Sequence, residues 1–150
     1  IATIILSISH IFSSLLQPIF GFFADNCYKR AFIFWGLIFT SLFIPLAPAA
    51  YNVILMALMI VLGSLGSSLF HPQALGLANI FSGTNKGRNM SIFIALGTLG
   101  NSIGPLLSAS VAQFLGLAKM PILSVFGIIW ASLMFKFIPK LSSNIKIHEN

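Results

Sequence analysis

Apolar residues fill this chain in five long runs, which are separated by short stretches containing polar residues, glycine or proline. A helix needs about 20 predominantly apolar residues to cross the hydrocarbon core of a bilayer. Transmembrane strands alternate apolar and polar residues, and these runs do not. The pattern therefore predicts an all-α, polytopic transmembrane helical bundle. Because the connections are short, we expect sequential helices to be antiparallel neighbours. The expected spans are about 1–23, 31–49, 53–79, 90–115 and 121–138.

Few charged residues are available to cover a water-exposed surface. Charged residues make up 7% of the chain and the mean hydropathy is +1.00, whereas a soluble domain carries about 25% charged residues. We therefore expect lipid to surround most of the chain. This composition excludes a soluble enzyme and a disordered tail. It also excludes a nucleic-acid-binding protein, because the basic residues behind the net charge of +6 lie between apolar runs and not in a basic groove.

The positions of the basic residues predict an orientation, because Lys and Arg are enriched in cytoplasmic loops. Only Lys119 lies on one side of the expected membrane. The other basic residues lie on the opposite side: Lys29, Arg30, Lys86, Arg88, Lys136, Lys140 and Lys146. We therefore expect a protein of the cell (inner) membrane with segments 24–30 and 81–89 in the cytoplasm. Residues 139–150 are expected to start a cytoplasmic central loop or tail.

Polar residues and a glycine recur along the first run at alternating steps of three and four. They are Ser7, His10, Ser14, Gln17 and Gly21, and we call them the polar stripe. This spacing keeps the stripe on one side of a helix, and lipid would reject such a side. Two interpretations stay open, because the stripe either lines a water-filled cavity or forms a buried polar seam between helices.

The first cytoplasmic turn combines a glycine, an acid and two bases, namely Gly21, Asp25, Lys29 and Arg30. A basic membrane anchor with an incidental acid would contain the same charges. The spacing resembles the Gly-x-x-x-Asp-(Arg/Lys)-x-Gly-(Arg/Lys)-(Arg/Lys) signature between the second and third helices of the major facilitator superfamily. Two positions of the signature differ in this chain. The resemblance implies a gate motif that stabilises the outward-open state against the other half of the transporter.

The fourth run contains a Gly-x-x-x-Gly step at Gly100 and Gly104, which lets two helix backbones approach closely. Pro105 removes a backbone donor and bends the helix. Tight helix packing alone accounts for this pattern. Together with Gly97, the run also resembles the Gly-x-x-x-Gly-Pro core of a motif in the fifth helix of drug–proton antiporters of the same superfamily. The resemblance implies that these residues set helix packing and a kink.

The third run contains His71, and a histidine in a charge-poor span is a functional candidate. A neutral histidine hydrogen-bonded to a neighbouring helix is the alternative. The sequence Phe70-His71-Pro72 resembles the fosmidomycin-resistance branch of the superfamily. In that branch an acid often follows His-Pro, whereas this chain has Gln73. A carboxylate proton carrier is therefore absent at this position.

A short internal similarity links the first and fourth runs. Residues 18–21 read Pro-Ile-Phe-Gly, and residues 105–108 read Pro-Leu-Leu-Ser. Because a period of three helices reverses direction, this similarity favours an inverted repeat. Chance matches in an apolar sequence are an equally good explanation.

The chain lacks the residue sets that enzymes and metal sites need. It has no Gly-rich phosphate loop with a lysine, no metal-ligand pair at i and i+4, and no Ser, His and acid set. Its single cysteine, Cys27, excludes an intramolecular disulfide. Within the expected spans only His10 and His71 titrate near neutral pH. We therefore expect no enzymatic activity, no cofactor and no metal.

Taken together, the resemblances imply helices two to six of a twelve-helix major facilitator transporter, from the N-terminal half of that fold. The implied function is proton-coupled efflux of a small molecule or drug by rocking of two halves. Uptake of a sugar or organic acid, or a non-functional fragment of a broken gene, stays open. The implied partners are lipid, a small-molecule substrate, protons, and a missing N-terminal helix and C-terminal half. The candidates for substrate or proton contact are His10, Gln17, His71, Gln73 and Asn101.

Overall fold

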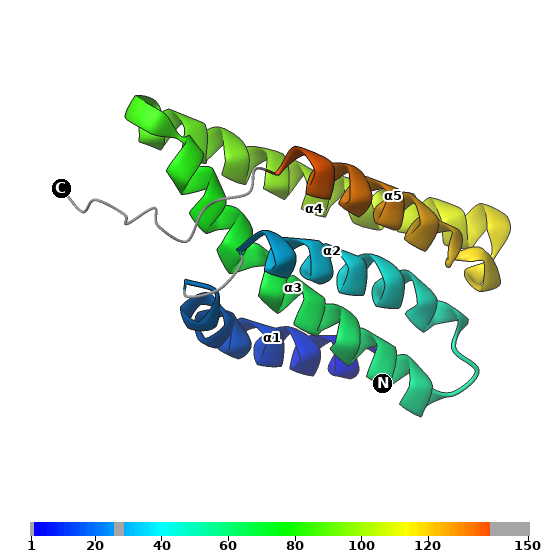
Figure 1. Ribbon diagram of the computed structural model, residues 1–150. Coiled ribbons are helices and arrows are strands. Elements are labelled where there is room, and N and C mark those ends of the chain that lie inside the picture. The colour runs from blue at the N-terminus through cyan, green and yellow to red at the C-terminus, as the bar shows by residue number, and fades with distance from the viewer. Residues whose placement is uncertain (1, 26–28, 139–150) are drawn as a thin grey trace.

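The computed structural model describes residues 2–25 and 29–138, and these residues form helices and turns without a strand (Figure 1). Single 3₁₀ turns follow the second helix and precede the fourth and the fifth. Together with these turns, the five helices are long and apolar enough to cross a membrane, which confirms the expected polytopic bundle. The helices are α1 (Ala2–Asp25), α2 (Lys29–Leu46), α3 (Val53–Phe81), α4 (Lys86–Leu115) and α5 (Ile122–Phe137). The turns are η1 (Ala47–Ala49), η2 (Gly83–Asn85) and η3 (Leu117–Lys119).

Local side-chain signals set several helix ends. Asn52 caps α3, because its side chain accepts a hydrogen bond of 2.7 Å from the backbone N–H of Leu55. Gly116 ends α4 with φ of 83°, a backbone conformation that a residue with a Cβ rarely adopts. The turn between α3 and α4 is held by Asn89, whose amide donates to the carbonyl of Ser82 at 2.8 Å.

The helices do not pack in sequence order. In Figure 1, α3 lies between α1 and α2, and α5 packs against α2. The expectation that every helix packs beside its sequence neighbour holds for α2 with α3, but it is wrong for α1 with α2, for α3 with α4 and for α4 with α5, which make few contacts. The physical reason in the first case is that α3 occupies the space between α1 and α2. Two chain reversals separate α1 from α3, so these two neighbours run parallel.

Glycines bring α2 and α3 into close backbone contact. A Cβ built on Gly36 would lie 2.7 Å from the carbonyl oxygen of Gly66, and one on Gly66 would lie 2.6 Å from the backbone nitrogen of Thr40. The hydroxyl of Thr40 donates across the same interface to the carbonyl of Gly63 at 3.1 Å. Small residues and interhelical hydrogen bonds of this kind hold helices together in lipid, where apolar burial gives little driving force.

The contact between α2 and α5 uses the same devices. Gly127 of α5 faces the side chain of Ser41, so that a Cβ on Gly127 would overlap it. Ser124, which is 5% exposed, donates to the carbonyl of Leu42 at 3.2 Å. The four helices α1, α3, α2 and α5 therefore form a connected packed unit, which α4 joins mainly at its ends.

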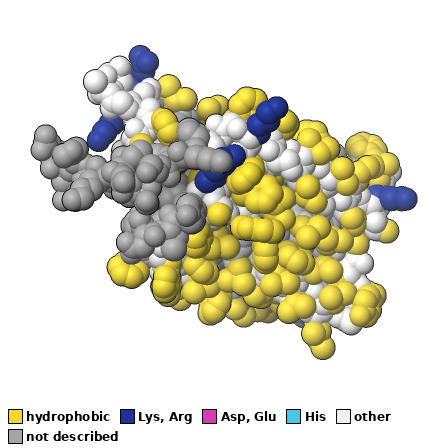
Figure 2. Space-filling view, in the orientation of Figure 1, with side chains coloured by type: hydrophobic (Ala, Val, Ile, Leu, Met, Phe, Trp, Pro, Cys, Tyr) yellow, Lys and Arg dark blue, Asp and Glu magenta, His cyan; other side chains and the backbone are white. Residues whose placement is uncertain are grey.

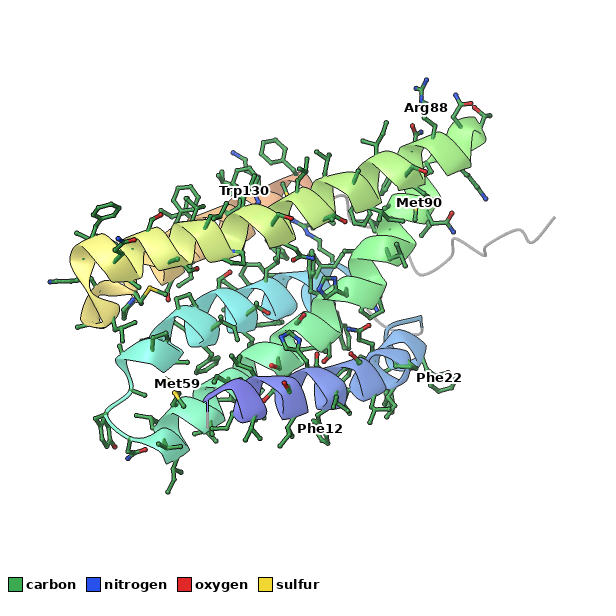
Figure 3. The ribbon with its side chains drawn as sticks, turned by 180° about the vertical axis from the view of Figure 1, so that it is seen from behind. Phe12, Phe22, Met59, Arg88, Met90 and Trp130 are labelled. Atoms are coloured by element: carbon green, nitrogen blue, oxygen red, sulfur yellow. The ribbon has the colours of Figure 1, made fainter. Side chains whose placement is uncertain are left out.

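The outer surface matches a lipid environment. Figure 2 shows hydrophobic side chains over most of this face and Lys and Arg side chains in a few separate places, and the described basic residues lie at or near helix ends. Many large apolar residues are exposed, including Phe22 at 70% and Phe126 at 76%. Arg88 extends away from the molecule at the turn between α3 and α4 (Figure 3). Charges at the ends and apolar side chains between them are what a bilayer selects.

Candidate functional site

A buried group of serines joins α1 to α3. The hydroxyl of Ser13 lies 2.6 Å from that of Ser68 and donates to the carbonyl of Ser64 at 2.9 Å. Ser68 is fully buried, and its hydroxyl lies 2.9 Å from the carbonyl of Ser13. These bonds satisfy polar groups that lipid would leave without partners. The contact was not predicted, although serines at 9 and 13 in one run and at 64 and 68 in another give a recognisable spacing of four.

Gln73 belongs to the same contact between α1 and α3. Its side chain is only 3% exposed, and its amide nitrogen lies 3.5 Å from the carbonyl of Phe20. The amide therefore reaches α1 at a second level, about one and a half to two helical turns beyond the serines. This position makes Gln73 a contact between helices and not a side chain that faces an open space within the described chain.

The polar stripe lies beside the serine contact and not in it. Ser7, His10 and Ser14 are exposed, and Gln17 and Gly21 are partly exposed. Ser14 donates to the carbonyl of His10 one turn earlier at 2.9 Å. None of the described helices covers this side of α1, because α3 contacts α1 through the neighbouring positions, among them Ser13.

His71 lies on the same flank of the α1–α3 pair as His10. An α-helix turns by about 100° per residue. His10 is therefore offset from Ser13 by about 60° in one rotational sense, and His71 is offset from Ser68 by about 60° in the opposite sense. Because α1 and α3 run parallel and face each other, opposite offsets point to the same side.

The C-terminal end of the polar stripe, Gly21, lies close to the residue that follows His71. A Cβ built on Gly21 would lie 3.8 Å from the Cβ of Pro72, the residue after His71. The imidazole of His71 is exposed, and its ring meets that of Phe70 edge-on with centroids 5.4 Å apart. We call the exposed residues His10, Ser14 and His71, together with Gln17, the polar flank. These polar residues share one flank of two parallel helices.

The gate motif is only partly visible. The backbones of Asp25 and Lys29 end α1 and begin α2, but their side chains lie outside the described part of the chain, as do residues 26–28. Arg30 is described, and its guanidinium donates to the carbonyl of Phe135 in α5. The guanidinium carbon also lies 4.0 Å from the centroid of the Phe135 ring. Arg30 therefore contacts a helix within the described chain.

The glycines of α4 face no neighbouring helix among the described residues. A Cβ built on Gly97, Gly100 or Gly104 would have no neighbouring atom within 4 Å, and α4 has no buried residue. Asn101 is exposed on the same side of α4 as Gly97 and Gly104. Pro105 lies inside α4, which continues to Leu115. No group of three or more His, Cys, Asp or Glu residues that could hold a metal ion occurs in the described residues.

Five membrane-length helices, basic ends and a polar flank define a polytopic helical membrane protein. The sequence profile of the Major Facilitator Superfamily matches residues 1–149, and the chain belongs to this family, as the sequence resemblance predicted. The chain is similar to the fosmidomycin resistance protein of Escherichia coli (strain K12), with 36% identity over 101 residues, which cover 66% of this chain and 24% of the relative.

A second curated relative is the uncharacterized MFS-type transporter YfnC of Bacillus subtilis (strain 168). It is 29% identical over 123 residues, which cover 81% of this chain and 28% of the relative. The chain thus spans about a quarter of the length of the curated relatives it matches. No solved structure matches the chain significantly.

Proposed function

We propose that this chain is part of a secondary active transporter that exports a small molecule or drug in exchange for protons. Membership of the Major Facilitator Superfamily supports membrane transport. The similarity to a fosmidomycin resistance protein favours efflux over uptake, since export lowers the internal concentration of a toxic compound. The observation that carries the proposal is the polar flank of α1 and α3, which is exposed in the middle of otherwise apolar helices.

The polar flank forms one wall of the substrate cavity in this proposal. Lipid disfavours exposed hydroxyl, amide and imidazole groups at this depth, so such a surface faces protein or water. The cavity interpretation is supported over the buried seam because the described helices that pack together do so through Ser13 and Ser68 and not through the stripe. Asn101 of α4 is a further candidate for substrate contact in this proposal.

Proton coupling would use the two histidines of the flank. His10 and His71 are the histidines of the described helices, and imidazole is the side-chain group best suited to proton exchange near neutral pH. Protonation of an imidazole changes its hydrogen-bonding capacity from one donor and one acceptor to two donors. A substrate that binds one protonation state better than the other would thereby couple its movement to the proton gradient.

The proposed location is the inner membrane, with segments 24–30 and 81–89 in the cytoplasm. The basic residues of the described helix ends support this orientation, because Arg30, Lys86, Arg88 and Lys136 all lie on one side of the bundle and Lys119 lies on the other. The central loop proposed for residues 139–150 would leave the membrane on this cytoplasmic side.

A helix that precedes Ile1 would complete this half of the transporter, and the packing suggests where it lies. In an inverted repeat, α1 corresponds to α4 and α2 to α5, which leaves α3 without an equivalent. Pro18 and Pro105 lie past the middle of α1 and α4 in the same way. Neither α1 with α2 nor α4 with α5 forms a substantial contact. Because α3 fills the space between the first pair, the preceding helix would fill the space between the second pair, against Gly97 and Gly104.

The test compares cells with and without the complete gene for accumulation of fosmidomycin and of unrelated drugs. The proposal expects lower accumulation in cells that carry the gene, and loss of the difference when the proton gradient is collapsed. Equal accumulation would remove the efflux proposal. Gene-dependent accumulation of a sugar or organic acid would support uptake, and a reading frame that ends before the second half would indicate a broken gene.

The role of His71 is tested separately in vesicles that contain the complete transporter. In the parent protein we expect the transport rate to change by about tenfold across the pH range where an imidazole titrates. This change in rate is expected to be lost in His71→Ala. Leu75→Ala is the matched control, because Leu75 is exposed about one turn away on α3 and does not titrate. An unchanged pH profile for His71→Ala would leave His71 as a packing residue.

A further inference from the structure

Arg30 connects the start of one helix to the end of another. It is the second residue of α2, and Phe135 lies in the last turn of α5. The guanidinium donates to the Phe135 carbonyl and lies over the Phe135 ring, with 4.0 Å between Cζ and the ring centroid. The same ring packs against Phe34 of α2, with centroids 4.6 Å apart. We call Arg30, Phe34 and Phe135 the basic–aromatic cluster.

Arg30 supplies a hydrogen-bond donor to a backbone carbonyl at the C-terminal end of α5. The last four carbonyls of an α-helix have no donor within the helix, and the Phe135 carbonyl is one of them. A cation at this end also interacts favourably with the partial negative charge of the helix dipole. The planar guanidinium combines a directed hydrogen bond with stacking on an aromatic ring, which an ammonium group does less well.

The positive charge of Arg30 interacts unfavourably with the dipole of its own helix, α2. A cation in the first turn of α2 lies at the positive end of the α2 dipole, which is unfavourable. The contact with the carbonyl end of α5 offsets this cost by supplying negative partial charge from a neighbouring helix. The position of Arg30 is therefore explained by α5 and not by the helix that contains it.

We propose that Arg30 is a positioning residue that fixes the cytoplasmic end of α5 against the start of α2. The gate motif would then be divided by function, with Arg30 bonded inside its own half and Asp25 and Lys29 left to meet the other half. The assignment of Asp25 and Lys29 rests on the proposed transport function, whereas the bond between Arg30 and α5 does not. The Nε–H of Arg30 is buried and has no hydrogen-bond partner among the described residues.

The test measures the distance between the two helix ends by thiol cross-linking in membranes that contain the complete transporter. All variants carry Cys27→Ser. The end pair is Phe34→Cys with Phe135→Cys, which removes both rings of the cluster but keeps the backbone carbonyl that Arg30 binds, so that it reports the effect of this hydrogen bond alone. The middle pair is Ser41→Cys with Ser124→Cys, which reports packing of α2 and α5 away from the cluster. Cross-linking needs no transport, so its outcome is independent of the proposed function.

Arg30→Gln is expected to lower the cross-linking yield of the end pair by about fivefold, the effect of losing one cation at a helix end, and to leave the middle pair unchanged. Lys29→Gln is the matched control and is expected to leave both pairs unchanged. An unchanged end pair in Arg30→Gln, or an equal fall in both charge variants, would overturn the proposal. If Arg30→Gln does not reach the membrane, Arg30→Lys decides: an intermediate yield supports the proposal, and a yield equal to that of the parent overturns it.

Transport kinetics give a second readout in the complete protein without the added cysteines. A positioning role predicts that Arg30→Gln lowers the maximal rate by about tenfold with the KM unchanged, because the substrate contacts stay in place. Arg30→Lys is expected to restore part of the rate. A rise in KM at an unchanged maximal rate would place Arg30 at the substrate and overturn the positioning role.

Discussion

Glycines of the α2–α3 interface and glycines of α4 have opposite surroundings. A Cβ on Gly36 or Gly66 would overlap backbone atoms of the facing helix. A Cβ on Gly100 or Gly104 would meet no atom within 4 Å. Both sets belong to apolar helices of membrane length, and the α4 set has the more regular spacing. The more regular glycine spacing is therefore found in α4, where no other helix of the described chain packs against the glycines.

The difference shows what glycine spacing encodes in a membrane helix. Lipid is as apolar as leucine, so helices associate through close packing and hydrogen bonds and not through burial of apolar area. A small-residue face makes close approach possible, and the α2–α3 interface uses it together with the bond from Thr40 to Gly63. In α4 the same kind of face is exposed, which fits a surface completed by another helix of the transporter.

Gly66→Val tests the tightly packed α2–α3 interface and is expected to have the largest effect on stability. The new Cβ would lie 2.6 Å from the nitrogen of Thr40 and 2.7 Å from the carbonyl oxygen of Gly36, and neither backbone atom has room to move alone. The helices would have to separate, which costs about 3 kcal/mol from overpacking, and the Thr40 hydrogen bond would be lost as well. We expect a lower unfolding midpoint of the complete transporter in detergent, measured by denaturant titration. An unchanged midpoint would show that α2 and α3 do not pack this closely.

Gly104→Leu tests the exposed glycine face of α4. In the described chain this side chain would enter empty space, so the effect depends on whether another helix packs there in the complete protein. If a preceding helix lies against this face, the substitution should destabilise the protein by about 1–2 kcal/mol through overpacking. The measurement is the same denaturant titration.

The control for this substitution is Ala95→Leu on the same helix. Ala95 is exposed and lies on the side of α4 opposite Gly104, since nine residues correspond to about half a turn beyond two full turns. It should leave the midpoint unchanged. Equal effects of the two substitutions would mean that the two faces of α4 do not differ, and the proposed position of the preceding helix would be lost.

The apolar runs were sufficient to predict the helices, because bilayer thickness fixes the length of a spanning element. Segment boundaries moved by a few residues, as at Lys86, where polar residues continue α4 beyond its apolar run, and at Leu46, where α2 ends and η1 begins. Helix order in space was not predictable from connection length. The position of α3 between α1 and α2 depends on which faces carry Gly36, Gly66, Ser13 and Ser68, and these contacts join residues far apart in the sequence.

The candidate site was predicted in part. The spacing of the polar stripe placed its members on one side of α1, which the structure shows to be uncovered by the described helices. Sequence spacing did not reveal that Gln73 is buried against Phe20 or that Arg30 binds α5. Both contacts depend on the direction of a side chain relative to a distant helix, and a one-dimensional pattern does not contain that direction.

Gly76→Ala completes the glycine comparison with the smallest expected effect and the opposite sign. Gly76 lies inside α3, ten residues after Gly66, but a Cβ on it would meet nothing within 4 Å. Alanine loses less backbone freedom than glycine on forming a helix, so the substitution should stabilise the protein by about 0.5 kcal/mol. The unfolding midpoint of the complete transporter should therefore rise slightly with Gly76→Ala and fall strongly with Gly66→Val. A fall for Gly76→Ala would mean that another part of the transporter packs against α3 at this level, and the face of α3 around Gly76 would then belong with the closed interfaces.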